Sequence, residues 1–144
     1  MSKLMTLAAM FVVAYTLTMT AQAQANPVEA AQRCVTHVNR VADRAEAVIA
    51  DDTAACLQEI RRLLCAGRVE AAHAVARRCH QDAKEVVRRA AAEIDTVCTN
   101  CIRYLDSVGA FRLARRVDNH CGLVLDGLDA LLDRQQQALA DALN

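Results

Sequence analysis

The sequence predicts an all-α fold, an elongated antiparallel bundle of three long helices that meet along coiled-coil-like seams. Three observations predict it. Apolar residues recur at close to 3.5-residue spacing over three long segments, Gly67 and Gly109 separate these segments, and no stretch of useful length alternates apolar and polar residues as a strand would. Because the connections are short, consecutive helices are expected to run antiparallel.

The first 23 residues have the features of a secretory signal peptide. Lys3 precedes an apolar run from Leu4 to Tyr15, and residues 21–23 read Ala-Gln-Ala, a small-residue cleavage site. This run is shorter than the ~20 residues needed to span a bilayer, and no later stretch could serve as a transmembrane helix. We therefore expect a secreted or periplasmic chain, with a single helical domain over residues 24–144.

The first helix is expected to begin at Asn26 and to end at Gly67. An asparagine cap, a proline at the first helical position and Glu29 at the third form a complete helix start. The pair at residues 51–52, Asp-Asp, could instead cap a new helix after a break, and Asp95 marks a second place where a helix could break. The bundle could then contain four or five helices.

The second and third apolar stripes run from Val69 to Val108 and from Ala110 to Ala142. Glycine suits the left-handed position that ends a helix and reverses the chain, which is the role expected for Gly67 and Gly109. The chain is 54% hydrophobic but only 3% aromatic, so its core must be thin and rich in alanine. Such a core buries little area per residue and would gain from covalent staples.

An internal repeat relates the two predicted hairpins. A shift of 42 residues superposes residues 56–79 on residues 98–121, and in each copy a glycine stands eleven residues after one cysteine and twelve before another. A repeat of this kind indicates that one supersecondary unit is used twice.

Six of the seven cysteines fall at matching heights of the predicted bundle. Residues equally far from a turn lie at the same height in an antiparallel hairpin, so reflection about the two glycines assigns a partner to each cysteine. The resulting level pairs are Cys56 with Cys79, Cys98 with Cys121, and Cys34 with Cys101. In an oxidising compartment these pairs are first of all disulfide candidates.

Cys65 is the one cysteine for which this reflection finds no cysteine partner. Reflection about Gly67 sends it to Val69, which cannot bond with it. Because loop tips are exposed, we expect a free thiol or one that is bonded to another chain.

The same arithmetic supports an alternative interpretation as a metal site. One layer of the bundle would contain Cys34, Cys98, Cys101, His120 and Cys121. Thiolates and imidazoles that project into a bundle core suit Cu(I) or Zn(II). The alternative function is therefore a cell-envelope protein that sequesters copper or zinc. A third interpretation of the same cysteines is that they are buried free thiols.

Other chemistries find less support. Ile102 follows Cys101 where haem attachment requires histidine, and no nucleophile-base pair or phosphate-binding glycine loop is present. His73 and His80 are expected to be ordinary surface histidines. A formal net charge of zero disfavours binding to nucleic acid. We expect a binding or structural module that is not an enzyme, needs no cofactor, and pairs with an unidentified protein or with itself.

Overall fold

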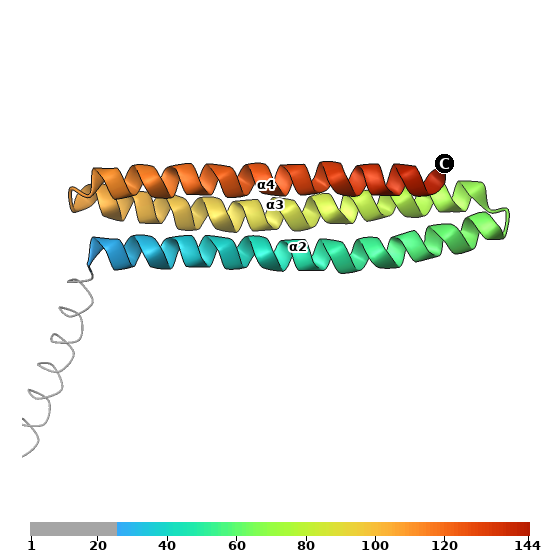
Figure 1. Ribbon diagram of the computed structural model, residues 1–144, viewed down its shortest axis with the longest axis horizontal. Helices are drawn as coiled ribbons and strands as arrows, with labels where there is room; N and C mark the ends of the chain where they lie inside the picture. The colour runs from blue at the N-terminus through green and yellow to red at the C-terminus, as the bar shows by residue number, and fades with distance from the viewer. Residues whose placement is uncertain (1–25) are drawn as a thin grey trace, which may run out of the picture.

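The computed structural model describes residues 26–144, which form three α-helices and no strand. Their bounds are Pro27–Cys65 for α2, Val69–Ser107 for α3 and Phe111–Leu143 for α4. The helices lie side by side in an elongated up-down-up bundle, with the two turns at opposite ends (Figure 1). The predicted all-α bundle is confirmed, whereas the predicted signal peptide over residues 1–23 lies outside the described residues.

Neither of the two helix breaks considered from the sequence occurs. Asp51 and Asp52 are exposed residues within α2, and Asp95 is an exposed residue within α3. On α2 the apolar stripe keeps its phase past the aspartates, because Ile49 and Ile60 are both buried and lie eleven residues, or about three turns, apart. Burial of one continuous face therefore outweighs the local capping preference of the aspartates.

The beginning of α2 follows the predicted capping pattern. The side-chain oxygen of Asn26 accepts a hydrogen bond of 2.9 Å from the backbone N–H of Val28, and Pro27 is the first helical residue. This bond satisfies one of the orphan donors of the first turn. The starts of α3 and α4 have no side-chain cap bond, so these two helices begin directly from the preceding turns.

Both turns are closed by the same pair of backbone hydrogen bonds. Gly67 and Gly109 have φ angles of 73° and 74°, in the left-handed region that favours glycine. In the first turn, Arg68 N–H donates to the Leu63 carbonyl at 2.9 Å and Gly67 N–H donates to the Leu64 carbonyl at 3.0 Å. The corresponding bonds of the second turn measure 2.8 and 3.0 Å. This is the Schellman arrangement, and it satisfies carbonyls that a helix end leaves unpaired.

The core is thin and contains no buried aromatic side chain among residues 26–144. Alanine is the commonest buried residue, with seven buried alanines. Alanine brings helix axes close together but removes little apolar surface from water, so the larger residues contribute most of the burial energy. The largest fully buried side chains are those of Val38, Ile49, Ile60, Ile94, Leu105 and Val117.

Candidate functional site

Three disulfides join the helices, and α3 contributes one cysteine to each of them. Their Cα–Cα separations are 6.4, 6.5 and 6.5 Å, within the range that a disulfide spans. The pairs are the three that the height arithmetic predicts. They are Cys34–Cys101 and Cys56–Cys79 between α2 and α3, and Cys98–Cys121 between α3 and α4.

Two of the disulfides lie next to each other near the α3–α4 turn. Cys98 and Cys101 are one helical turn apart on α3, and they bond to α4 and to α2 respectively. Four sulfur atoms therefore form one layer that crosslinks all three helices, and we call it the sulfur layer. Cys98, Cys101 and Cys121 are each 5% exposed, so this layer is part of the core.

The predicted metal ligands have other partners in this structure. The four cysteines of the proposed ligand set are disulfide-bonded. The ring Nε2 of His120 lies 2.7 Å from Oδ1 of Asn39, a contact between α4 and α2. Within residues 26–144, no group of three or more His, Cys, Asp or Glu side chains is arranged to hold a metal ion. Metal binding by the reduced chain stays a prediction.

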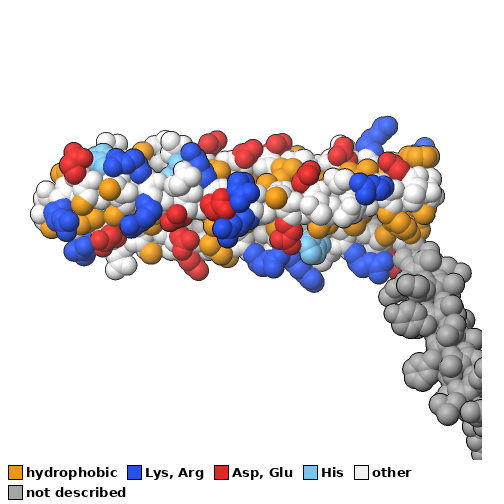
Figure 2. Space-filling model, turned by 180° about the vertical axis from the view of Figure 1, so that it is seen from behind, with side chains coloured by type: hydrophobic (Ala, Val, Ile, Leu, Met, Phe, Trp, Pro, Cys, Tyr) orange, Lys and Arg blue, Asp and Glu red, His pale blue; other side chains and the backbone are white. Residues whose placement is uncertain are grey.

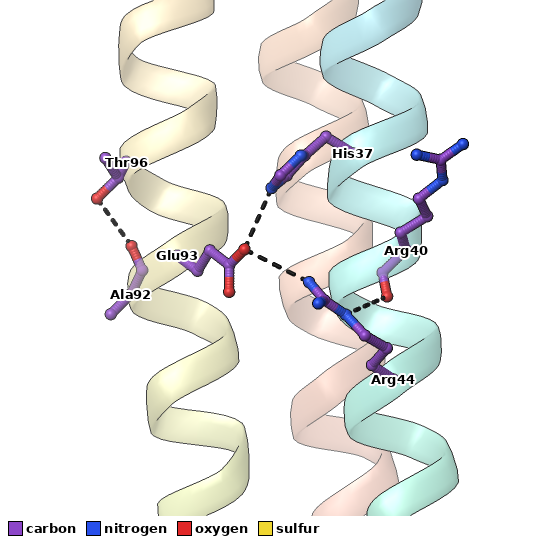
Figure 3. Close-up of polar contacts among 6 residues, drawn as sticks. All are labelled: His37, Arg40, Arg44, Ala92, Glu93 and Thr96. Carbon is purple, nitrogen blue, oxygen red and sulfur yellow. Dashed lines mark hydrogen bonds and ion pairs between the residues drawn. The ribbon is translucent and has the colours of Figure 1, made fainter.

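Glu93 of α3 makes polar contacts with two side chains of α2. Figure 3 shows this carboxylate projecting from α3 between His37 and Arg44 of α2. Glu93 Oε1 lies 3.1 Å from the His37 Nε2 and 3.5 Å from the nearer Arg44 nitrogen. All three side chains are about half exposed or more, so water and salt weaken these interactions. The contact helps to fix the register of the hairpin but buries no charge.

Gln135 of α4 is the one buried polar residue among residues 26–144, and the sequence analysis did not single it out. Its Oε1 accepts a hydrogen bond of 2.9 Å from Nδ1 of His80, and its Nε2 donates one of 3.3 Å to the Cys79 carbonyl. The prediction that His80 is an ordinary surface histidine is therefore wrong. The available signal was the position of Gln135, seven residues after the buried Leu128 and so on the same helix face.

The described part of the chain has one free cysteine, Cys65. It is exposed and is the last residue of α2, beside the turn at Gly67. This position matches the expected accessible thiol. Whether another chain binds it stays a prediction.

Glu59 of α2 and Glu85 of α3 form ion pairs with arginines of their own helices. Glu59 bonds to Arg62, and Glu85 bonds to both Arg88 and Arg89, with 2.7 Å between the closest atoms of each Glu85 pair. The hydrogen bonds from its two arginines lower the pKa of Glu85 from 4.5 to about 2. Figure 2 shows cationic and acidic side chains interspersed along the bundle. This mixed pattern is that of a solvated surface.

An open groove of about 550 Å³ runs between α3 and α4 beside the Cys98–Cys121 disulfide. Acidic residues of both helices line it, among them Asp95, Asp118 and Asp126. Gly122 also lines the groove, and a β-carbon added at this glycine would meet no atom within 4 Å. Packing inside the bundle therefore does not require glycine at this position.

Searches of protein families, curated proteins and solved structures find no match to this chain. Among the described residues, no helix is long and apolar enough to cross a membrane. Functional inference therefore rests on the geometry of residues 26–144.

Proposed function

We propose that the protein is an exported helical module, stapled by disulfides, that acts as a structural element or a binding surface and catalyses no reaction. The observation that supports this most directly is the bonding of α3 to both of its neighbours by three disulfides. Disulfides of this kind persist in oxidising compartments and are rare in the cytosol. Export is consistent with the predicted signal peptide.

The staples have a physical purpose in this bundle. Each 39-residue helix is about 58 Å long at 1.5 Å per residue, yet half of the buried apolar residues are alanine or valine. Long helices with little buried apolar area separate easily, and a covalent bond between two helices limits that separation. A stiff rod with fixed surface geometry suits a scaffold or a docking partner.

Export and oxidation can be tested together. The full chain, including residues 1–23, would be expressed in a bacterial host, and residues 24–144 alone would be kept in the cytosol of the same host. We expect the exported chain to be processed near Gln24 and to contain at most one titratable thiol, Cys65, whereas the cytosolic chain retains reduced cysteines. A full-length chain that stays in the cytosol with its thiols reduced would overturn the proposal.

A second candidate function is the binding of copper or zinc by the reduced chain. The sulfur layer favours it, because Cys34, Cys98, Cys101 and Cys121 approach one another from three helices. Reduction of the two disulfides would release four thiols at one height of the core, and soft thiolate ligands suit Cu(I) and Zn(II). His120 would have to leave Asn39 to take part.

A further inference from the structure

The exposed side of α4 includes a regularly spaced series of charged and polar residues around Gly122. Seven exposed residues recur at alternating spacings of three and four, as the contact positions of a coiled coil do. The buried side of the same helix includes Val117, Cys121 and Leu128. Asn119, Gly122 and Asp126 of this series also line the groove between α3 and α4. We call these seven residues the outer stripe: Arg112, Arg115, Asn119, Gly122, Asp126, Asp129 and Asp133.

Charges are segregated along the outer stripe. The arginines stand before Gly122 and the aspartates after it, so like charges are neighbours at spacings of three and four, which destabilises an isolated helix. The order also opposes the helix dipole, since α4 has no acidic residue in its first turn and no basic residue in its last. Within residues 26–144, none of the charged side chains of the outer stripe forms an ion pair.

The centre of the outer stripe is open and partly apolar. Gly122 is a poor helix former, and no atom of the bundle would obstruct a larger residue there. Next to it, Leu123 is 70% exposed, the highest value among the large apolar side chains of residues 26–144. A glycine beside an exposed leucine is an arrangement that lets a second helix approach closely.

We infer that a second copy of this chain packs antiparallel against the outer stripe, with a two-fold axis passing beside Gly122. This inference deepens the proposed structural role, on which it rests, by naming the partner. In this register Arg112 lies opposite the partner's Asp133 and Arg115 opposite the partner's Asp129. Asn119 then faces the partner's Asp126, and the two copies of Gly122 meet at the axis.

The charge order is the reason for choosing a second copy as the partner. About Gly122 the stripe reads basic, basic, amide on one side and acidic, acidic, acidic on the other. When a second copy runs antiparallel, its acidic half faces the basic half of the first copy, and its basic half faces the acidic half. Each contact therefore occurs twice, as in an isologous dimer. The pairing would place every unpaired arginine of the stripe next to an aspartate and would cover Leu123 with the partner's Leu123.

This contact is distinct from a bond through Cys65. Along the bundle axis, the α2–α3 turn is separated from Gly122 by about 27 helical residues, each of which adds 1.5 Å. This separation applies on both sides of the two-fold axis, so the two copies of Cys65 would stand on the order of 80 Å apart in the side-by-side dimer. A Cys65 disulfide could therefore join only bundles that meet end to end. The Cys65→Ser variant isolates the side-by-side contact.

Sedimentation equilibrium of the oxidised Cys65→Ser protein tests the inference. We expect a reversible dimer at concentrations below ~1 mM, with association that weakens as salt rises, because its ion pairs are exposed. Arg115→Asp and Asp129→Arg should each weaken dimerisation at least ~10-fold, and the double variant should restore it to within ~3-fold. The matched control is Arg103→Asp, an exposed arginine on α3, which should leave dimerisation unchanged.

Crosslinking tests the register. In the Cys65→Ser background, Leu123→Cys should form a disulfide-linked dimer under air, whereas Ala130→Cys should not, because its two copies would lie about 24 Å apart. A protein that remains monomeric at ~1 mM, or a dimer that the double charge reversal fails to restore, would overturn the inference. A monomer with its three disulfides intact would leave the proposed stapled module standing.

Discussion

Cys98 and Cys101 lie one turn apart on α3, and each is bonded to a different neighbouring helix. Cys98 bonds to Cys121 of α4, and Cys101 bonds to Cys34 of α2. The central helix is thus fixed to both neighbours within one turn of its length. Because Cys56–Cys79 fixes α3 to α2 again near the opposite end, neither α2 nor α3 can slide past the other.

Removing each disulfide should cost an amount that follows the size of the loop it closes. The Cys56–Cys79 bond spans 23 residues and Cys34–Cys101 spans 67. Loop entropy then predicts losses of about 3 and about 4 kcal/mol for the corresponding double serine variants. Urea unfolding followed by circular dichroism would measure both. A loss below about 0.5 kcal/mol for either variant would show that the bond is not formed.

The hydrogen bonds of Gln135 should stabilise the bundle measurably. Gln135→Ala removes the acceptor of His80 Nδ1 and opens a cavity, so we expect a loss of about 1–3 kcal/mol in the free energy of unfolding. His80→Ala provides the second edge of a double-mutant cycle, with an expected coupling of about 1 kcal/mol. Gln137→Ala, at an exposed site on the same helix, is the control. Additive effects of the Gln135 and His80 changes would contradict this account.

Two glycines of the chain should respond in opposite ways to alanine. At Gly109 the φ of 74° costs an alanine roughly 1–2 kcal/mol, so Gly109→Ala should lower the thermal midpoint. Gly122 is helical with open space around it, so Gly122→Ala should raise stability by about 0.5–1 kcal/mol. Dilute protein would be used, so that self-association does not contribute. Destabilisation by both substitutions would mean that Gly122 has a structural role inside the bundle.

Metal binding by the reduced chain should depend on the sulfur layer alone. Reduced protein would be titrated with Cu(I) or Zn(II) against a competing chromogenic chelator. We expect Cys98→Ser with Cys121→Ser to abolish binding, since both residues belong to the layer. The control, Cys56→Ser with Cys79→Ser, should leave binding unchanged. Equal losses from both pairs would show that the layer is not a specific site.

Much of the fold could be predicted because it follows from spacing along the chain. The two turn glycines define the helix ends, and reflection about them places cysteines of consecutive helices at one height, so the three pairs need no further information. The break considered at Asp51-Asp52 failed for a related reason. A capping preference acts over one turn, whereas the buried stripe on either side, from Ile49 to Ile60, holds the helix together over three.

The polar contacts could not be predicted in the same way. Height alone does not say how each helix is rotated about its axis or which rotamer a side chain adopts. His120 has the right height for the sulfur layer, but its ring reaches Asn39 on α2. Gln135 stands on an apolar face, and only the packed bundle shows that His80 and the Cys79 carbonyl satisfy its amide.

The central claim is the disulfide pattern, and peptide mapping of unreduced protein tests it most directly. After trypsin digestion, Cys98 and Cys101 stay together in the peptide of residues 90–103. We expect this peptide to be joined to two others at once, those of residues 34–40 and 117–134, in a single three-peptide species.

A separate two-peptide species should join residues 45–61 to residues 79–84 through Cys56 and Cys79. The peptide that contains Cys65, residues 63–68, should be either free or linked to its own copy. Mass spectrometry under non-reducing conditions distinguishes these species by mass. The three-peptide species is the result that the account predicts, and a peptide of residues 90–103 with an internal Cys98–Cys101 bond, or with two free thiols, would contradict it.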